Sequence, residues 1–98
     1  MENNKRDELI RLYDIYGCLL TDKQKNYFED YYFMDLSISE IAENYQISRN
    51  GVFDQLKRVN ILLEDYESKL NLDKKISNIE KLEINEEIKN EILNIIKE

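Results

Sequence analysis

Residues 37–58 read SISEIAENYQISRNGVFDQLKR, and this stretch decides the fold. Ser37, followed three residues later by a glutamate, forms a capping box, which predicts that a short helix begins here. After a short turn, Ser48 is placed to cap a second helix. Two helices that cross closely need a small residue at their contact, and Ala42, the single alanine of the chain, supplies it. The pattern predicts a helix-turn-helix.

Helical periodicity extends in both directions from this segment. Residues 5–19 carry apolar side chains at intervals of three and four, which predicts a first helix with Gly17 just after its C-terminus. Thr21 opens another capping box and an aromatic-rich helix over about residues 22–33. We expect its rings to pack in or near the core, and the alternative is that its tyrosines stack on exposed bases. In the second helix of the central pair, the apolar steps of four and three continue to Leu70. They predict one unbroken helix of roughly 33 Å.

The C-terminal part of the chain has a looser pattern that is still helical. Asp73 or Ser77 could cap one further helix, and Asn85 could cap a last amphipathic helix rich in isoleucine. The chain has no proline, two glycines and no extended alternation of apolar and polar residues, which predicts an all-α fold. We expect a helix-turn-helix domain over residues 1–72 and a helical extension over residues 73–98 that serves packing or dimerisation.

The net charge of −7 contrasts with the basic balance that is typical of DNA-binding domains, whose affinity depends on phosphate contacts. Residues 1–48 carry five basic and ten acidic side chains, and residues 59–98 carry six and ten. Residues 49–58 carry three basic side chains against Asp54 alone. The basic stretch therefore coincides with the start of the predicted recognition helix. We expect DNA binding that is weak and sensitive to salt.

The predicted recognition helix begins with side chains that suit a DNA groove. A serine hydroxyl and the free amides of a helix N-terminus can hold a phosphate. An arginine can pair with guanine, and an asparagine with adenine. The residues that we expect to face DNA are Ser48, Arg49, Asn50, Phe53, Asp54, Lys57 and Arg58.

Two residues depart from the usual helix-turn-helix pattern. Gln46 stands at the turn position commonly occupied by glycine, where a left-handed backbone would cost about 1 kcal/mol or more. Gly51 lies inside the recognition helix, at a cost of roughly 1 kcal/mol relative to alanine. Asn50 and Gly51 also form a strong turn dipeptide. Either the helix begins only after Gly51, or its first turn is softened and Arg49 and Asn50 are aimed less firmly.

The stretch LTDKQKNYFEDYYFMDLSISEIAENYQISRNGVFDQLKR resembles region 4 of bacterial sigma factors, which binds promoter DNA through a helix-turn-helix. The chain from RLYDIYGCLLTDKQKNYFEDYYFMDLSISEIAENY through LLEDYESKL resembles the YlxM-like family of small bacterial helix-turn-helix proteins. The resemblance covers roughly residues 5–72. It implies a DNA-binding regulatory protein. The usual position of the family's genes, beside those of the signal recognition particle, implies a link to that pathway.

The composition argues against an enzyme. The chain lacks histidine, the usual general base and metal ligand, and it has no glycine-rich nucleotide motif, so we expect no cofactor or metal. Cys18 is the only cysteine, and its apolar neighbours predict a buried structural thiol in a reducing compartment. No apolar run is long enough for a signal peptide or a membrane span, so we expect the protein in the cytoplasm and not in a membrane.

Two hypotheses about function remain open. In the first, a regulator binds double-stranded DNA as a homodimer formed through the long helix and the C-terminal extension, which would double a small basic footprint. The apolar stripe of the long helix could instead pack within the chain. In the second, the protein is an interaction module for a protein or ribonucleoprotein. It keeps the helix-turn-helix scaffold, binds DNA weakly or not at all, and turns its acidic surface toward a basic partner.

Overall fold

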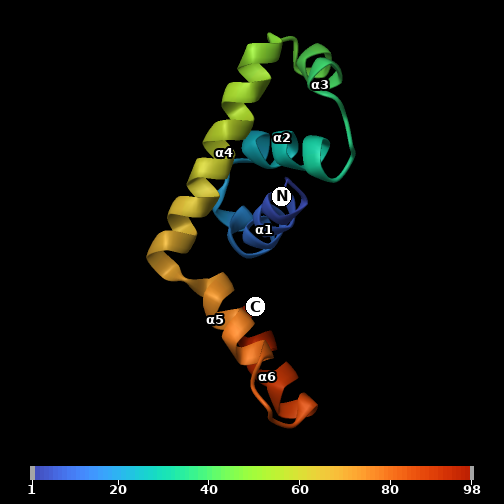
Figure 1. Ribbon diagram of the computed structural model, residues 1–98. Helices are drawn as coiled ribbons and strands as arrows, with labels where there is room; N and C mark the ends of the chain where they lie inside the picture. Colours follow the sequence, from blue (N-terminus) through green and yellow to red (C-terminus); the bar gives the residue numbers. More distant parts are fainter. Residues whose placement is uncertain (1, 98) are drawn as a thin grey trace.

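The computed structural model describes residues 2–97, which form six α-helices and a short 3-10 turn, with no strand in this range (Figure 1). In chain order the elements are α1 (Glu2–Tyr16), the 3-10 turn (Gly17–Leu19), α2 (Asp22–Tyr32), α3 (Ile38–Tyr45), α4 (Arg49–Leu70), α5 (Leu72–Glu80) and α6 (Glu86–Lys97). The predicted all-α fold is confirmed, with its helix-turn-helix, its long fourth helix and its helical C-terminal extension.

Helix α4 forms one side of the fold, and α1, α2 and α3 pack against it (Figure 1). One core cluster joins α1 and α2 to the second half of α4, and it contains Leu9, Leu12, Tyr16, Leu20, Phe28, Val59 and Leu63. A second cluster joins α2 and α3 to the first half of α4, and it contains Tyr27, Ile41, Ala42, Val52 and Leu56. The apolar stripe of α4 between Val52 and Leu63 is therefore buried within the chain. Of the two roles open to this stripe, intramolecular packing is the one observed.

The aromatic side chains of α2 form much of this core, as the sequence predicts. Phe28 is fully buried and stacks on Tyr13, with ring centroids 4.3 Å apart and an interplanar angle of 7°. Tyr27 is also fully buried, and its ring lies 4.7 Å from that of Tyr45 in α3. Phe33, just after α2, remains 47% exposed. Its ring nevertheless lies 5.9 Å from that of Phe28 and 5.8 Å from that of Tyr13, so it packs at the edge of the core. Core and near-core packing is thus confirmed for these rings.

The starts of α2 and α3 follow the predicted capping boxes. The Thr21 hydroxyl accepts from the Gln24 N–H at 3.2 Å, and the Gln24 side chain accepts from the Thr21 N–H at 2.9 Å. Ser37 and Glu40 repeat the arrangement at 3.1 and 2.9 Å. Hydrogen bonds from the Ser37 backbone and hydroxyl hold the pKa of the Glu40 carboxyl below its usual value. These local bonds satisfy amides that have no partner inside a helix.

The first helix ends at Tyr16 with Gly17 directly after it, as the sequence predicts. Gly17 has no positive φ, so it does not adopt the left-handed backbone common for a glycine at this position. Its small size matters instead, because a Cβ at this position would lie 3.2 Å from the Tyr13 ring. Cys18 is exposed, so the prediction of a buried thiol is wrong. The chain around the 3-10 turn buries Gly17 and Leu20 and leaves Cys18 outside.

Helix α5 begins earlier than the sequence predicts. Asn71 adopts a left-handed backbone with φ 56° and ψ 31°, ends α4, and precedes α5 directly. Neither Asp73 nor Ser77 is the N-cap of α5, so that prediction is wrong. The Asn71 side chain makes no capping hydrogen bond either. The amides at the start of α5 must therefore be satisfied from elsewhere in the fold.

A carboxylate of α4 caps α5. Glu67 accepts from the backbone N–H of Asp73 at 3.0 Å and from that of Lys74 at 3.2 Å. The buried Tyr16 hydroxyl donates to Glu67 at 2.7 Å and accepts from the Leu72 N–H at 3.1 Å. Burial and the bond to Glu67 raise the pKa of Tyr16 to about 12. This network sets the angle at which the chain leaves the body of the fold.

Helices α5 and α6 form a hairpin that extends away from the body, and the end of α6 returns toward α5 (Figure 1). The molecule is accordingly elongated, with extents of 50 × 23 × 21 Å. Asn85 accepts from the Glu87 N–H at 2.7 Å, which confirms its predicted role as the cap of α6. In the hairpin only Ile76 and Leu93 are buried among the described residues. Its packing is therefore much thinner than that of the body.

Candidate nucleic-acid interface

The turn between α3 and α4 is a Schellman motif. Gln46 has φ 56° and ψ 44°, so the left-handed backbone predicted at this position is confirmed. The Ile47 N–H donates to the Ala42 carbonyl at 3.0 Å, and the Gln46 N–H donates to the Glu43 carbonyl at 3.3 Å. Ile47 also packs against the cluster that contains Ala42. These bonds satisfy carbonyls at the end of α3 and hold the direction of the turn.

Helix α3 is held in place by its buried face and by one hydrogen bond to α2. Ile41 is fully buried and Ala42 is 6% exposed, and both pack in the cluster that includes Val52. At the end of α3, the Tyr45 hydroxyl donates to the Asp30 carboxylate at 2.9 Å. Burial and this bond raise the pKa of Tyr45 to about 12. The orientation of α3 relative to α4 is thus set by side chains from three helices.

The recognition helix begins at Arg49, so the alternative of a start after Gly51 is wrong. The Ser48 hydroxyl oxygen accepts from the Gly51 N–H at 3.0 Å, and Gly51 itself is helical. The next residue, Val52, is fully buried, which anchors this first turn to the core. The cap and the anchor together outweigh the preference of an Asn–Gly pair for a turn.

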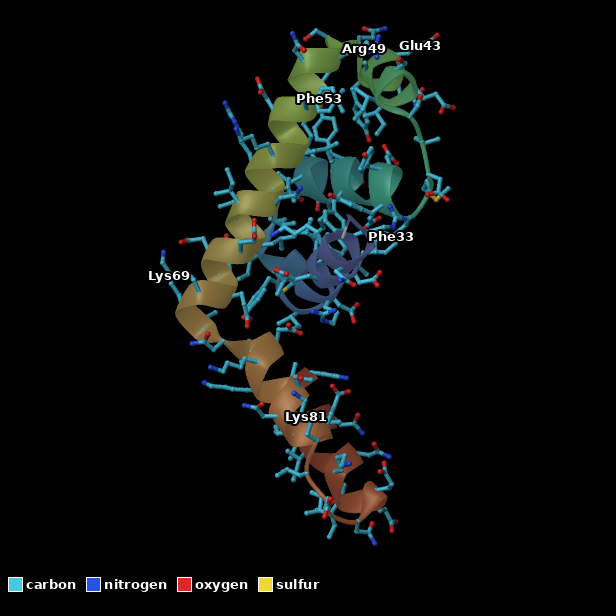
Figure 2. The ribbon with its side chains drawn as sticks, in the orientation of Figure 1. Phe33, Glu43, Arg49, Phe53, Lys69 and Lys81 are labelled. Atoms are coloured by element: carbon cyan, nitrogen blue, oxygen red, sulfur yellow. The ribbon has the colours of Figure 1, made fainter. Side chains whose placement is uncertain are left out.

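All seven residues that we expected at DNA are exposed in the structure: Ser48, Arg49, Asn50, Phe53, Asp54, Lys57 and Arg58. Asn50, Asp54 and Lys57 follow one another at intervals of four and three, so they share a face of α4. Figure 2 shows Arg49 at the free end of α4, and Phe53 one turn further along on the side of α2 and α3. The structure therefore places Asn50, Asp54 and Lys57 along one outward face. Phe53 lies four residues from both Arg49 and Lys57, at the edge of this face on the side of α2 and α3.

The basic charges of the first three turns of α4 are not neutralised by neighbours. Within residues 2–97, Arg49, Lys57 and Arg58 form no ion pair, whereas Lys69 on the same helix pairs with Asp65 at 2.9 Å. Asp54 is the one acidic side chain in the segment from Ser48 to Arg58. The first three turns of α4 thus present a small surface of free positive charge in an otherwise acidic protein.

A groove of about 460 Å³ lies beside this face, and the sequence analysis did not predict it. Phe53 and Ile61 line it from α4 and are 56% and 54% exposed. Tyr31 of α2 and Ile38 of α3 line the opposite side. The one residue that could have indicated this groove in the sequence is Ile61, because it is apolar and falls outside the buried stripe of α4. The groove brings an exposed apolar surface next to the basic one.

A short helix, a tight left-handed turn and a capped second helix with exposed basic turns define a helix-turn-helix protein. A family model described as "Putative helix-turn-helix protein, YlxM / p13 like" matches residues 3–98, and the chain belongs to this family, UPF0122.

Relatives within the family share about half of the aligned residues. The chain is 51% identical over 72 residues to the UPF0122 protein of Streptococcus suis and 49% identical over 72 residues to that of Streptococcus mutans. It is 52% identical over 78 residues to that of Anoxybacillus flavithermus. The alignments cover 74%, 74% and 80% of this chain and 64%, 66% and 71% of the respective relatives. The chain thus spans less than two thirds of the length of the two streptococcal proteins.

Within residues 2–97, every helix is too short or too polar to cross a lipid bilayer.

The left-handed turn provides a first testable prediction. Gln46→Gly is expected to raise the free energy of unfolding by about 1 kcal/mol, because glycine adopts a positive φ without the steric cost that a Cβ imposes. Gln46 is exposed, so its side chain contributes little packing that could be lost. Urea unfolding followed by circular dichroism measures the change, with the slope expected to stay constant.

The matched control is the same replacement inside a helix. Gln55→Gly, in the middle of α4, is expected to lower the free energy of unfolding by about 1 kcal/mol. If both replacements destabilise the protein by similar amounts, the strain assigned to Gln46 is not real.

Proposed function

We propose that this protein binds double-stranded DNA with α4 as its recognition helix and acts as a DNA-binding regulator. The observation that supports it is the free, positively charged start of α4. Arg49, Lys57 and Arg58 are exposed and have no carboxylate partner within residues 2–97. The first turn of α4 is capped by Ser48 and anchored by the buried Val52, which counteracts the softening expected from Gly51.

Each side chain of this face has a chemical role in the proposal. The Ser48 oxygen accepts from the Gly51 N–H, which leaves its own proton to donate to a phosphate. Arg49 can donate two hydrogen bonds to guanine, and Asn50 can pair with adenine. The Asp54 carboxylate repels phosphate but can accept from the amino group of cytosine. We therefore assign phosphate contacts to Lys57 and Arg58, about two turns further on, and base contacts to the first turn.

The test is a titration of labelled genomic DNA fragments at several salt concentrations, read by fluorescence anisotropy. The two phosphate contacts assigned to Lys57 and Arg58 predict that the logarithm of affinity falls with the logarithm of salt concentration at a slope of roughly −2 per protomer. Arg49→Glu is expected to weaken binding at least tenfold, because it removes a base contact and places a negative charge at the groove. Binding by the wild-type protein with this dependence would support a working recognition helix.

Lys69→Glu is the matched control, because it makes the same charge change on the same helix. Lys69 lies at the opposite end of α4 (Figure 2), about 30 Å along the helix from Arg49. The Lys69→Glu variant is expected to bind DNA with the same affinity as the wild-type protein. Equal losses in the two variants would mean that binding follows net charge and not the recognition helix. No binding at low salt by folded protein would refute the DNA proposal.

A second candidate function is an interaction module for a basic protein or a ribonucleoprotein. The groove beside α4 favours it, because exposed Phe53 and Ile61 give a partner an apolar surface. The net charge of −7 favours a basic partner. The family resemblance makes components of the signal recognition particle the first partners to test. Under this hypothesis, Phe53→Ser would weaken partner binding while Arg49→Glu would not.

A further inference from the structure

The α5–α6 hairpin leaves much of its apolar surface uncovered. Ile88 and Ile95 of α6 are 53% and 74% exposed, and Leu82 and Ile84 between the helices are 47% and 38% exposed. The two helices have 9 and 12 residues, lengths at which a helix is marginal in water unless it is packed. A hairpin with so few buried side chains gains little from its own packing. A further surface that covers it would stabilise it.

Apolar residues form a continuous stripe on α6. The exposed Ile88, the half-buried Ile92 and the exposed Ile95 follow one another at intervals of four and three, so they lie along one face of the helix. Leu93 lies on a neighbouring face and is buried, at 8% exposure. Helix α6 therefore has two adjoining apolar faces, of which only one is used within the chain. Such a face is typical of a helix in a bundle of more than two helices.

The charges of the hairpin complement a second copy of the same hairpin. Lys74 and Lys75 lie at the start of α5, whereas Glu87 lies at the start of α6, at the far tip. The base of the hairpin is the start of α5 with the end of α6, and its tip is the connection between the two helices. If the tip of one copy packs against the base of the other, these lysines lie beside Glu87 of the other copy. The same arrangement brings Glu80 beside the other copy's Lys97. None of these five side chains forms an ion pair within residues 2–97.

We propose that the α5–α6 hairpin is a homodimerisation surface, in which the hairpins of two copies pack antiparallel into a four-helix bundle. In a dimer with a two-fold axis, the stripe of one copy packs against the identical stripe of the other, so a single apolar face per copy is sufficient to form the interface. Helix α6 is about 18 Å long and two helices side by side are about 20 Å wide, which gives a small interface. Interfaces at this lower end, below about 1,200 Å² in total, are typical of weak association, so we expect a micromolar dimer.

Analytical ultracentrifugation of the full chain tests the proposal across the micromolar range. The wild-type mass is expected to rise with concentration from 11.9 kDa toward twice that value. Ile88→Glu combined with Ile95→Glu is expected to keep the protein monomeric. Both positions are exposed in the single chain, so a folded monomer tolerates the change. Ile61→Glu is the control, because Ile61 is similarly exposed on α4, and it is expected to leave the dimer intact.

If the double isoleucine variant loses helicity, a pair of variants that exchanges two charges tests the same interface. Lys75→Glu is expected to weaken the dimer at least severalfold, and Glu87→Lys in the same chain is expected to restore it. A wild-type protein that stays monomeric throughout would overturn the proposal. So would a dimer that survives the double isoleucine replacement or that Ile61→Glu disrupts. These measurements are made without DNA, so their result does not depend on whether the protein binds DNA.

Discussion

Ala42→Leu is expected to lower the free energy of unfolding by about 1–3 kcal/mol, because it forces three extra carbons into a close-packed helix crossing. Ala42 is 6% exposed and packs against the first half of α4 in the cluster that includes Ile41 and Val52. A larger side chain there must push α3 away from α4. Since the Schellman turn joins the two helices at this point, the start of α4 is expected to shift as well. DNA affinity should therefore fall together with stability.

Urea unfolding and the anisotropy titration measure the two effects in the same variant. Asn44→Leu is the matched control, because Asn44 lies on the same helix and is exposed. It is expected to change the free energy of unfolding by no more than about 0.5 kcal/mol. A protein that accommodates the larger side chain in place of Ala42 at no cost would show that the contact between α3 and α4 is loose.

Glu67→Ala is expected to lower the free energy of unfolding by about 2–3 kcal/mol, with the effect concentrated in the C-terminal hairpin. Glu67 accepts hydrogen bonds from Tyr16 and from the amides of Asp73 and Lys74. One hydrogen bond to a charged acceptor contributes about 1.5–3 kcal/mol, and the donors at Tyr16 and Asp73 are partly buried. Bonds to the same carboxylate do not add fully, and the exposed Lys74 amide can bond to water instead. A carboxylate also interacts favourably with the N-terminus of a helix. The replacement removes all of these contributions.

Hydrogen exchange resolved by residue distinguishes a local effect from a global one. In Glu67→Ala, the amides of α5 and α6 are expected to lose protection well before those of α1 and α4. The control is Glu64→Ala, which removes a partly exposed ion pair with Lys5 one turn earlier on α4. It is expected to cost less than about 1 kcal/mol. Uniform loss of protection in Glu67→Ala would show that the carboxylate does not act as the cap of α5.

The features that were predicted correctly depend on residues close together in the sequence. The capping boxes at Thr21 and Ser37 join residues three apart, so their donors and acceptors can be read directly from the chain. The apolar stripe of α4 likewise depends on intervals of four and three. The left-handed backbone at Gln46 followed from the helix-turn-helix pattern around it. The exposed residues of the recognition helix could be named for the same reason, while their contact with DNA stays a prediction.

The features that were missed depend on residues far apart in the sequence. Cys18 has apolar neighbours, but only the packing of the 3-10 turn decides that it lies outside. The cap of α5 comes from Glu67 and is supported by Tyr16, which is 51 residues away from Glu67. The groove beside Ile61 exists only because residues of four helices meet around it. A pattern of neighbouring residues in the sequence cannot predict these contacts.

The sequence by itself therefore determined the fold class, the helix starts at the capping boxes, the helix-turn-helix and the location of its basic turns. These depend on hydrogen bonds and periodicity within single helices. The tertiary structure decided that the stripe of α4 packs inside the chain, that Glu67 caps α5, and that Ile88 and Ile95 remain uncovered. The physical reason is that amphipathicity shows which face of a helix avoids water. Which surface covers that face depends on how distant segments pack.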